Sequence, residues 1–134
     1  MSGAAEFEVV REVWNAFSRE DDESAVALIH PDAVIVPFGA ALEGKSYAGH
    51  DQILGWMRDD IRTNWEWFYT DPHEFRKVGE KLLVYGRWRA RGRDSGVELD
   101  VPATWVVEVR DGKIAGWQTF TDRDEAHRTV GLRE

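Results

Sequence analysis

The sequence predicts a fold of the α+β class, in which helices come first and an antiparallel sheet follows. Up to about residue 65, apolar residues recur at spacings of three and four, which is the period of a helix face. From residue 67 onward the apolar period is two, which is the period of a strand. Helices grouped ahead of strands favour α+β over an alternating α/β arrangement.

Three helices are expected in the first half of the chain. The first carries four apolar residues on one face: Phe7, Val10, Trp14 and Phe17. The second opens at the N-cap sequence 21–24, and Pro31 is expected to end it, because the residue before a proline avoids helical dihedrals. Its apolar residues are Val26, Leu28 and Ile29. The third opens at Asp51 and carries Ile53, Met57, Ile61 and Trp65 on one face.

A β-branched run over residues 33–38 predicts a strand, and residues 39–49 read as a loop with a short hairpin around Gly44. Further strands are expected over residues 67–69, 74–78, 82–91, 97–109 and 113–121. Asp111-Gly112 is a strong two-residue hairpin signal between the last two strands. Asp122 and Glu125 form a predicted capping box for a short closing helix that Gly131 ends.

Composition narrows the classes of function. A chain of 134 residues is the usual size of one domain, so we expect a single domain over residues 1–134. The net charge of −8 argues against nucleic acid and against anionic membrane surfaces as partners. There is no cysteine for a disulfide or a thiolate site, and no apolar run that would span a membrane. The N-terminal residues lack the pattern of a signal peptide, so a cytoplasmic globular protein is expected.

Seven tryptophans stand out in so short a chain. Each buries about 150–250 Å², so seven exceed what a small core needs for filling. We therefore expect several of them to line a cavity or an interface.

Three local motifs carry a family resemblance. They are Ala-Leu-Ile-His-Pro-Asp-Ala-Val at 27–34, Tyr-Ala-Gly-His-Asp-Gln-Ile at 47–53, and Asp-Gly-Lys-Ile-Ala-Gly-Trp at 111–117. In this order and spacing, the chain resembles the SnoaL-like branch of the nuclear transport factor 2-like superfamily. The resemblance implies a cystatin-like α+β barrel, in which N-terminal helices close a cone-shaped, strongly curved antiparallel or mixed sheet. It also implies an apolar pocket in the cone and a homodimer through the outer sheet face.

The superfamily includes ketosteroid isomerases, limonene epoxide hydrolases, polyketide cyclases, dehydratases and binding domains, so the fold does not select a function. The isomerase base aligns with Val36 or Pro37, its tyrosine with Val13 or Trp14, and its protonated acid with Thr104. The hydrolase triad aligns with Val84, Gly86 and Thr119, although a slip of one residue brings in Arg87. Neither catalytic set is present. Polyketide cyclases depend on an aspartate near the end of the sheet, and Asp122 is the candidate for it here. The favoured role of Asp122 is nevertheless that of N-cap of the closing helix.

Other residues remain as candidate acids and bases. Asp100 shares a strand face with Pro102 and Thr104, and burial against tryptophans would raise its pKa into a useful range. A solvent-exposed position at the strand end is the alternative. His50 lies at a helix entry, where it could act as a base at the pocket mouth. The catalytic candidates are therefore Asp100, Asp122 and His50.

The other histidines are expected to be structural. His30 could cap carbonyls, which is the favoured interpretation, or reach the floor of the pocket. His73 and His127 resemble surface residues. No histidine pair has the spacing of metal ligands, and no glycine-rich phosphate loop or nucleophile elbow is present. We therefore expect neither a metal nor a cofactor.

Alternation in strand 82–91 places Arg87, Arg89 and Arg91 on one face and Val84, Trp88 and Ala90 on the other. The apolar face should point inward, where Gly86 leaves room for a ligand or a bent strand. With the opposite parity, the arginines would bind an anion inside. Predicted ligand-binding residues are Trp14, Phe17, Phe38, Trp56, Trp67, Trp88, Thr104, Trp117 and Thr119. Trp105 has the opposite parity from Thr104 and is expected at a dimer contact.

Two functions follow from these observations. The first is a small-molecule enzyme or binder, with isomerase, cyclase, hydrolase or dehydratase chemistry on an apolar polycyclic or terpenoid-like substrate. The second is a module for ligand binding or dimerisation without catalysis. An enzyme should place a carboxylate or histidine inside the cavity, whereas a binding module should line it with apolar groups and hydroxyls.

Overall fold

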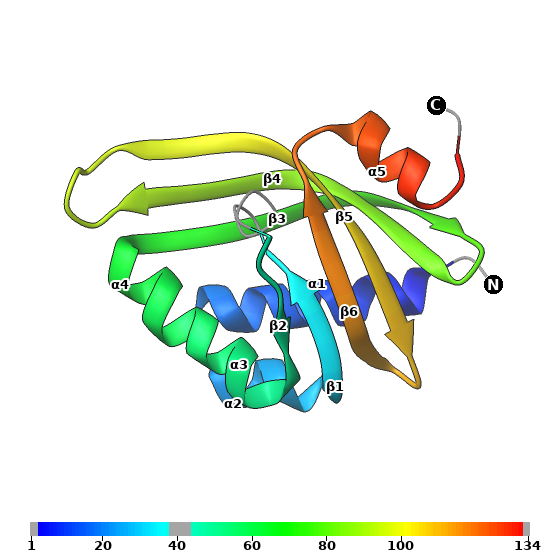
Figure 1. Cartoon of the computed structure of the whole chain (residues 1–134), viewed down its shortest axis with the longest axis horizontal. Coiled ribbons are helices and arrows are strands. Elements are labelled where there is room, and N and C mark those ends of the chain that lie inside the picture. Colours follow the sequence, from blue (N-terminus) through cyan, green and yellow to red (C-terminus); the bar gives the residue numbers. More distant parts are fainter. Residues whose placement is uncertain (1–2, 38–43, 133–134) are drawn as a thin grey trace.

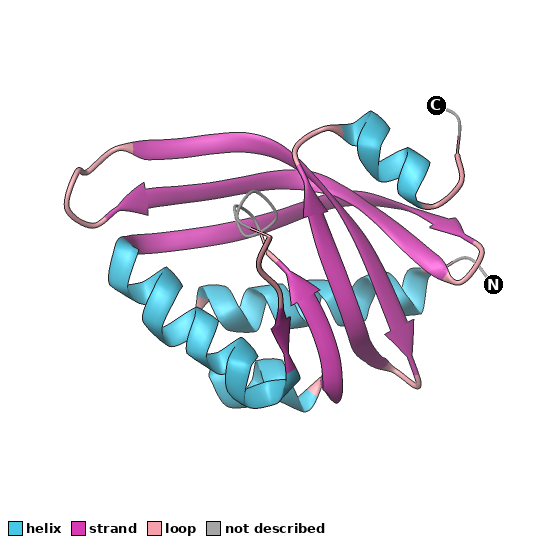
Figure 2. Cartoon of the chain, in the orientation of Figure 1, coloured by secondary structure: helices cyan, strands magenta, loops and turns pink. Residues whose placement is uncertain are grey.

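The computed structural model describes residues 3–37 and 44–132 of the chain. The sheet consists of β1 (Ile29–Val36), β2 (Tyr47–Ala48), β3 (Trp65–Val78), β4 (Lys81–Gly92), β5 (Glu98–Arg110) and β6 (Lys113–Phe120). The helical elements are α1 (Ala4–Ser18), α2 (Asp22–Ala27), α3 (Gly49–Gly55), the π-helical segment η2 (Trp56–Ile61), α4 (Arg62–Asn64) and α5 (Arg123–Thr129). Figure 2 shows these helices and strands, and the α+β prediction is confirmed.

The six strands form one mixed sheet in the order β2-β1-β6-β5-β4-β3. Only the pairing of β1 with β6 is parallel. The sheet curls, with α1 to α4 on one side and α5 on the other (Figure 1). The larger buried cluster lies between the sheet and the helices α1 and α3, and a smaller one lies beneath α5.

The predicted face of α1 is confirmed, because Phe7, Val10, Trp14 and Phe17 are all buried. The predicted boundary at Pro31 is wrong. Helix α2 ends at Ala27, and β1 begins at Ile29 and contains Pro31. Proline has no N–H to donate to a ladder, and Pro31 falls within the register shift between Ile29 and Val34 in the pairing with β6.

The third predicted helix begins at Gly49 rather than Asp51, and its middle is π-helical. Ile53, Met57 and Ile61 are buried as expected, but Trp65 starts β3 instead of continuing the helix. Tyr47 and Ala48 pair with Ile35 and Val34 of β1. The short hairpin expected around Gly44 falls largely on residues 38–43, which, with Phe38, lie outside the described residues.

The two strands predicted over 67–69 and 74–78 are one strand, β3, with a register shift between Pro72 and Glu74. Gly86 of β4 faces this irregularity. A Cβ at Gly86 would lie 2.0 Å from the carbonyl oxygen of Asp71, so the glycine admits a bent neighbouring strand rather than a ligand.

The closing hairpin and helix follow the sequence signals. Asp111 and Gly112 both have positive φ, 56° and 76°, as a type I′ turn requires. Asp122 caps α5 by accepting a hydrogen bond from the backbone N–H of Asp124 at 2.9 Å. No helix among the described residues combines the length and apolarity that crossing a membrane needs.

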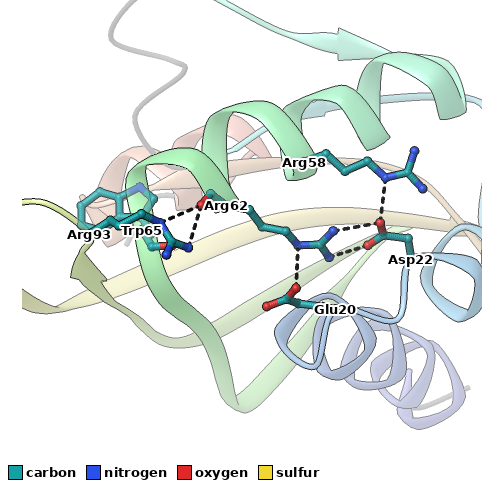
Figure 3. A network of polar contacts seen from close by, with 6 residues as sticks. All are labelled: Glu20, Asp22, Arg58, Arg62, Trp65 and Arg93. Carbon is teal, nitrogen blue, oxygen red and sulfur yellow. Dashed lines mark hydrogen bonds and ion pairs between the residues drawn. The ribbon is translucent and has the colours of Figure 1, made fainter.

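A charged cluster links α2 to η2 and α4 (Figure 3). The Asp22 carboxylate accepts two hydrogen bonds from Arg62, at 2.6 and 3.0 Å, and one from Arg58 at 3.0 Å. Arg93 in turn donates to the backbone carbonyls of Arg62 and Trp65, at the end of α4 and the start of β3. The cluster thus links α2 to η2 and α4, and Arg93 links the end of α4 to the turn after β4.

Candidate functional site

The candidate site is an aromatic cavity between the inner face of the sheet, α1 and η2. It is lined by Trp14, Phe17, Pro37, Trp56, Phe68, Thr70, Trp88, Trp105, Trp117 and Thr119. Five of the seven tryptophans therefore line this one cavity. Among these lining residues there is no carboxylate, histidine, lysine or arginine. Their polar side-chain groups are the hydroxyls of two threonines and the indole N–H groups of the tryptophans.

The rings of the cavity pack mostly edge to face. Trp56 meets Phe17, Phe68 and Trp117 with centroids 6.1–6.4 Å apart and interplanar angles of 69–84°. Trp14 lies against Trp105 at 4.4 Å. Such pairs stabilise each other beyond their buried area, so the walls form a connected set rather than independent side chains.

The free volume between these rings is about 20 Å³. That is room for about one water molecule. A larger ligand therefore requires part of the wall to move.

Strand alternation brings most of the expected ligand-binding residues to the cavity. Trp88 of β4, and Trp117 and Thr119 of β6, point inward, and Trp14, Phe17 and Trp56 face them from the helices. The arginines of β4 lie on the outer face as expected, where Arg87 and Arg91 pair with Asp100 and Glu98 of β5.

The predicted parity of β5 is wrong. Trp105, expected at a dimer contact, is 1% exposed and lines the cavity. Thr104, expected inside, is instead buried on the other face beside the cluster beneath α5, where its strand neighbour Val106 and its cross-strand partners Tyr85 and Phe120 pack.

Trp67 also lies on the outer face. Its ring stacks on Tyr69 at 5.3 Å, and it does not line the cavity. Phe68, the intervening residue of β3, points inward in its place. Phe68, Thr70, Trp105 and Pro37 also line the cavity, although they were not among the predicted ligand-binding residues. The one sequence signal for Trp105 was that it shares a strand face with the apolar residues Ala103 and Val107.

None of the three catalytic candidates reaches the cavity. Asp100 is 55% exposed and accepts a hydrogen bond from Arg87 Nε at 2.5 Å. This hydrogen bond, supported by the charges of Arg87 and Arg89, holds the pKa of Asp100 below its ordinary value. A raised pKa was expected from burial, and the outward parity of the strand removes that burial.

Asp122 is exposed and serves as the cap of α5. His50 donates from Nε2 to the backbone carbonyl of Ile29 at 2.7 Å and is not among the lining residues.

His30 contacts the carbonyl of Arg110 at 2.6 Å, in the expected structural role. His127, expected at the surface, is a buried residue of α5, with its Nε2 2.8 Å from the hydroxyl of Tyr85. Within residues 3–37 and 44–132, no group of three His, Asp or Glu residues is arranged to hold a metal ion.

Comparison with known proteins agrees with this fold. The profile of the SnoaL-like domain matches residues 10–117, which is most of the chain. The chain belongs to the SnoaL-like domain family. A search of curated proteins found no significant match.

Several solved structures resemble this SnoaL-like domain. An NTF2-like protein of unknown function from Burkholderia pseudomallei is 24% identical, with a TM-score of 0.74 and coverage of 96% of this chain and 98% of the other. TerC, co-crystallised with polyporic acid, is 22% identical, with a TM-score of 0.75 and coverage of 94% and 98%. A putative polyketide cyclase from Sinorhizobium meliloti is 26% identical, with a TM-score of 0.65 and coverage of 84% and 94%.

Proposed function

We propose that this SnoaL-like domain binds a small, uncharged, largely apolar molecule in the tryptophan-lined cavity and performs no acid–base catalysis on it. One observation carries the proposal: the described lining consists of aromatic rings, a proline and two threonines. General acid–base catalysis needs a titratable group within hydrogen-bonding reach of the reacting atom. Asp100, Asp122 and His50 all lie outside the cavity. Aromatic walls favour a flat, apolar ligand through contact area and ring stacking.

Opening of the wall is part of this proposal, because the free volume accommodates about one water molecule. Trp56 is the side chain best placed to move. It touches the rings of Phe17, Phe68 and Trp117, and it stands where α-helical hydrogen bonding changes to the wider π-helical pattern. Such π-helical segments occur frequently at functional sites.

The indole N–H resonances of the seven tryptophans test the binding site directly. On addition of a neutral aromatic probe such as toluene or indole to ¹⁵N-labelled protein, we expect the resonances of Trp14, Trp56, Trp88, Trp105 and Trp117 to shift. The resonance of Trp67, on the outer face, should stay in place as an internal control. Unchanged spectra at millimolar probe would overturn the proposal, as would a shift confined to Trp67.

The variants Trp56→Leu and Trp67→Leu form a matched pair for the same titration. Both remove a tryptophan, but only Trp56 lines the cavity. Trp56→Leu should change the probe affinity several-fold, whereas Trp67→Leu should leave it unchanged. Equal effects of the two substitutions would place binding elsewhere.

We propose further that a second copy of the chain covers part of the outer sheet face, as the family resemblance implies. Beside α5, a shallow groove of about 490 Å³ runs over β1, β6 and β5. Val34 in this groove is 47% exposed, and Val36, Val106 and Val130 continue its apolar lining. Lys81 and Glu108, which pair with each other, also line the groove. Exposed apolar patches of this kind occur at protein interfaces.

A further inference from the structure

Thr119 has a buried hydroxyl for which the described residues supply no hydrogen-bond partner. The side chain lies on β6, directly across from Trp105 of β5, and it lines the cavity. It is 5% exposed, and its Oγ1 atom is enclosed without a donor or acceptor in residues 3–37 and 44–132. Buried polar atoms in proteins are nearly always hydrogen-bonded, so the unpaired hydroxyl of Thr119 needs a physical explanation.

Leaving a hydroxyl unpaired in an apolar surrounding is unfavourable, whereas valine would fill the same space without that cost. The cavity has room for about one water, and a stable buried water needs two to four polar neighbours. Besides Thr119, the lining residues that the structure describes offer the hydroxyl of Thr70 and the indole N–H groups of the tryptophans, which can also pair with a ligand.

On the basis of the proposed binding function, we propose that the Thr119 hydroxyl is the group that selects the ligand, by hydrogen bonding to a neutral hydroxyl or carbonyl on an otherwise apolar molecule. A threonine hydroxyl can both donate and accept, so it suits either group. The surrounding rings accept the apolar part of the ligand. A charged ligand is disfavoured, because the described lining offers no opposite charge to compensate for its burial.

An organic cation is the competing ligand class, since ring faces can bind quaternary ammonium groups. Recognition through ring faces alone would leave the hydroxyl of Thr119 without a role. The two classes therefore differ in how binding depends on Thr119.

The test compares p-cresol with toluene, which differ by one hydroxyl, and includes tetramethylammonium as the cationic probe. Affinities are measured by titration of the wild-type chain, of Thr119→Val and of Thr104→Val. Thr104→Val is the matched control, because Thr104 is a buried threonine of the same sheet that does not line the cavity. The wild type should bind p-cresol about 2- to 10-fold more tightly than toluene, as expected for one net hydrogen bond.

Thr119→Val should bring the ratio of the two affinities close to one while leaving the affinity for toluene nearly unchanged, and Thr104→Val should keep the wild-type ratio. Equal binding of p-cresol and toluene by the wild type would overturn the role of Thr119 but leave the proposed cavity function intact. Preference for tetramethylammonium over both neutral probes would also overturn it. Absence of binding by every probe would instead contradict the proposed function itself.

Discussion

Threonine and valine have nearly the same shape, so a single substitution at Thr119 separates the effect of its hydroxyl from the effect of packing. In the ligand-free protein this hydroxyl is buried without a partner among the described residues. We expect Thr119→Val to raise the free energy of unfolding by about 1 kcal/mol, because the substitution removes an unsatisfied polar atom and adds apolar contact. Urea denaturation of the ligand-free chain measures this change.

Thr104→Val provides the comparison, because Thr104 is equally buried but is not among the unsatisfied groups. It should give no gain in stability. A loss of stability in Thr119→Val would mean that the hydroxyl has a partner in the ligand-free state. A gain would fit the general pattern in which binding sites retain groups that are unfavourable for stability.

The inward or outward direction of single residues was predictable only where the two faces of a strand differ in polarity. In β4, arginines alternate with apolar residues, and the prediction for Trp88 and Arg87 was correct. In β5 both faces are buried, since Trp105 faces the cavity and Val106 packs beneath α5. Alternation then carries no signal, and the position of α5 that buries the second face is not visible in the sequence.

Helix α2 is held in place by the Asp22 carboxylate, which is 12% exposed and accepts hydrogen bonds from Arg62 and Arg58. The hydrogen bond from Arg62, followed by that from Arg58, lowers the pKa of Asp22 in the folded chain. A carboxyl with a lowered pKa stabilises the fold when the pH is above its ordinary pKa of about 4. This contribution disappears as the pH falls through the folded-state pKa. Asp22→Asn should therefore lower the free energy of unfolding by about 2 kcal/mol at pH 7.

The difference between Asp22→Asn and the wild type should shrink as the pH falls from about 4 toward the folded-state pKa, because the carboxyl of the unfolded wild-type chain then binds a proton before that of the folded chain. Urea midpoints measured from pH 7 to pH 3 follow this trend. Asp32→Asn is a suitable control, since Asp32 is 76% exposed and lies 3.4 Å from a single arginine, Arg110. Exposed pairs contribute little, so this variant should behave like the wild type. A pH-independent difference for Asp22→Asn would contradict a stabilising role for the ionised Asp22 carboxylate.

The existence of most elements was predictable, but irregularities within strands were not. The two predicted strands are one strand, β3, with a register shift between Pro72 and Glu74. This register shift depends on the close approach of Gly86 from the neighbouring strand. Likewise, Pro31 lies within β1 because the pairing with β6 is interrupted there. Both features arise from contacts between strands that are distant in the sequence, which local propensity does not contain.

Across the whole molecule, the two faces of the sheet differ in what covers them. The inner face and the helices enclose the cavity, and the outer face is covered by α5 over only part of its area. Arginines and carboxylates pair with one another over β4 and β5. The apolar groove on β1 and β6 is therefore the part of the outer face best suited to a second copy.

A single charge in this groove tests the dimer. Val34→Glu places a carboxylate on a side chain that is 47% exposed in the isolated chain, so the fold should survive. In a dimer that carboxylate would lose its hydration in a groove whose lysine, Lys81, already pairs with Glu108, and we expect at least a tenfold weaker association, measured by sedimentation velocity over a range of concentrations. Val97→Glu is the matched control, because Val97 is 56% exposed in the turn between β4 and β5, away from the groove. It should associate like the wild type. A wild-type chain that stays monomeric at every concentration would contradict the dimer, whereas dimerisation of Val34→Glu with wild-type affinity would place the interface on a different face.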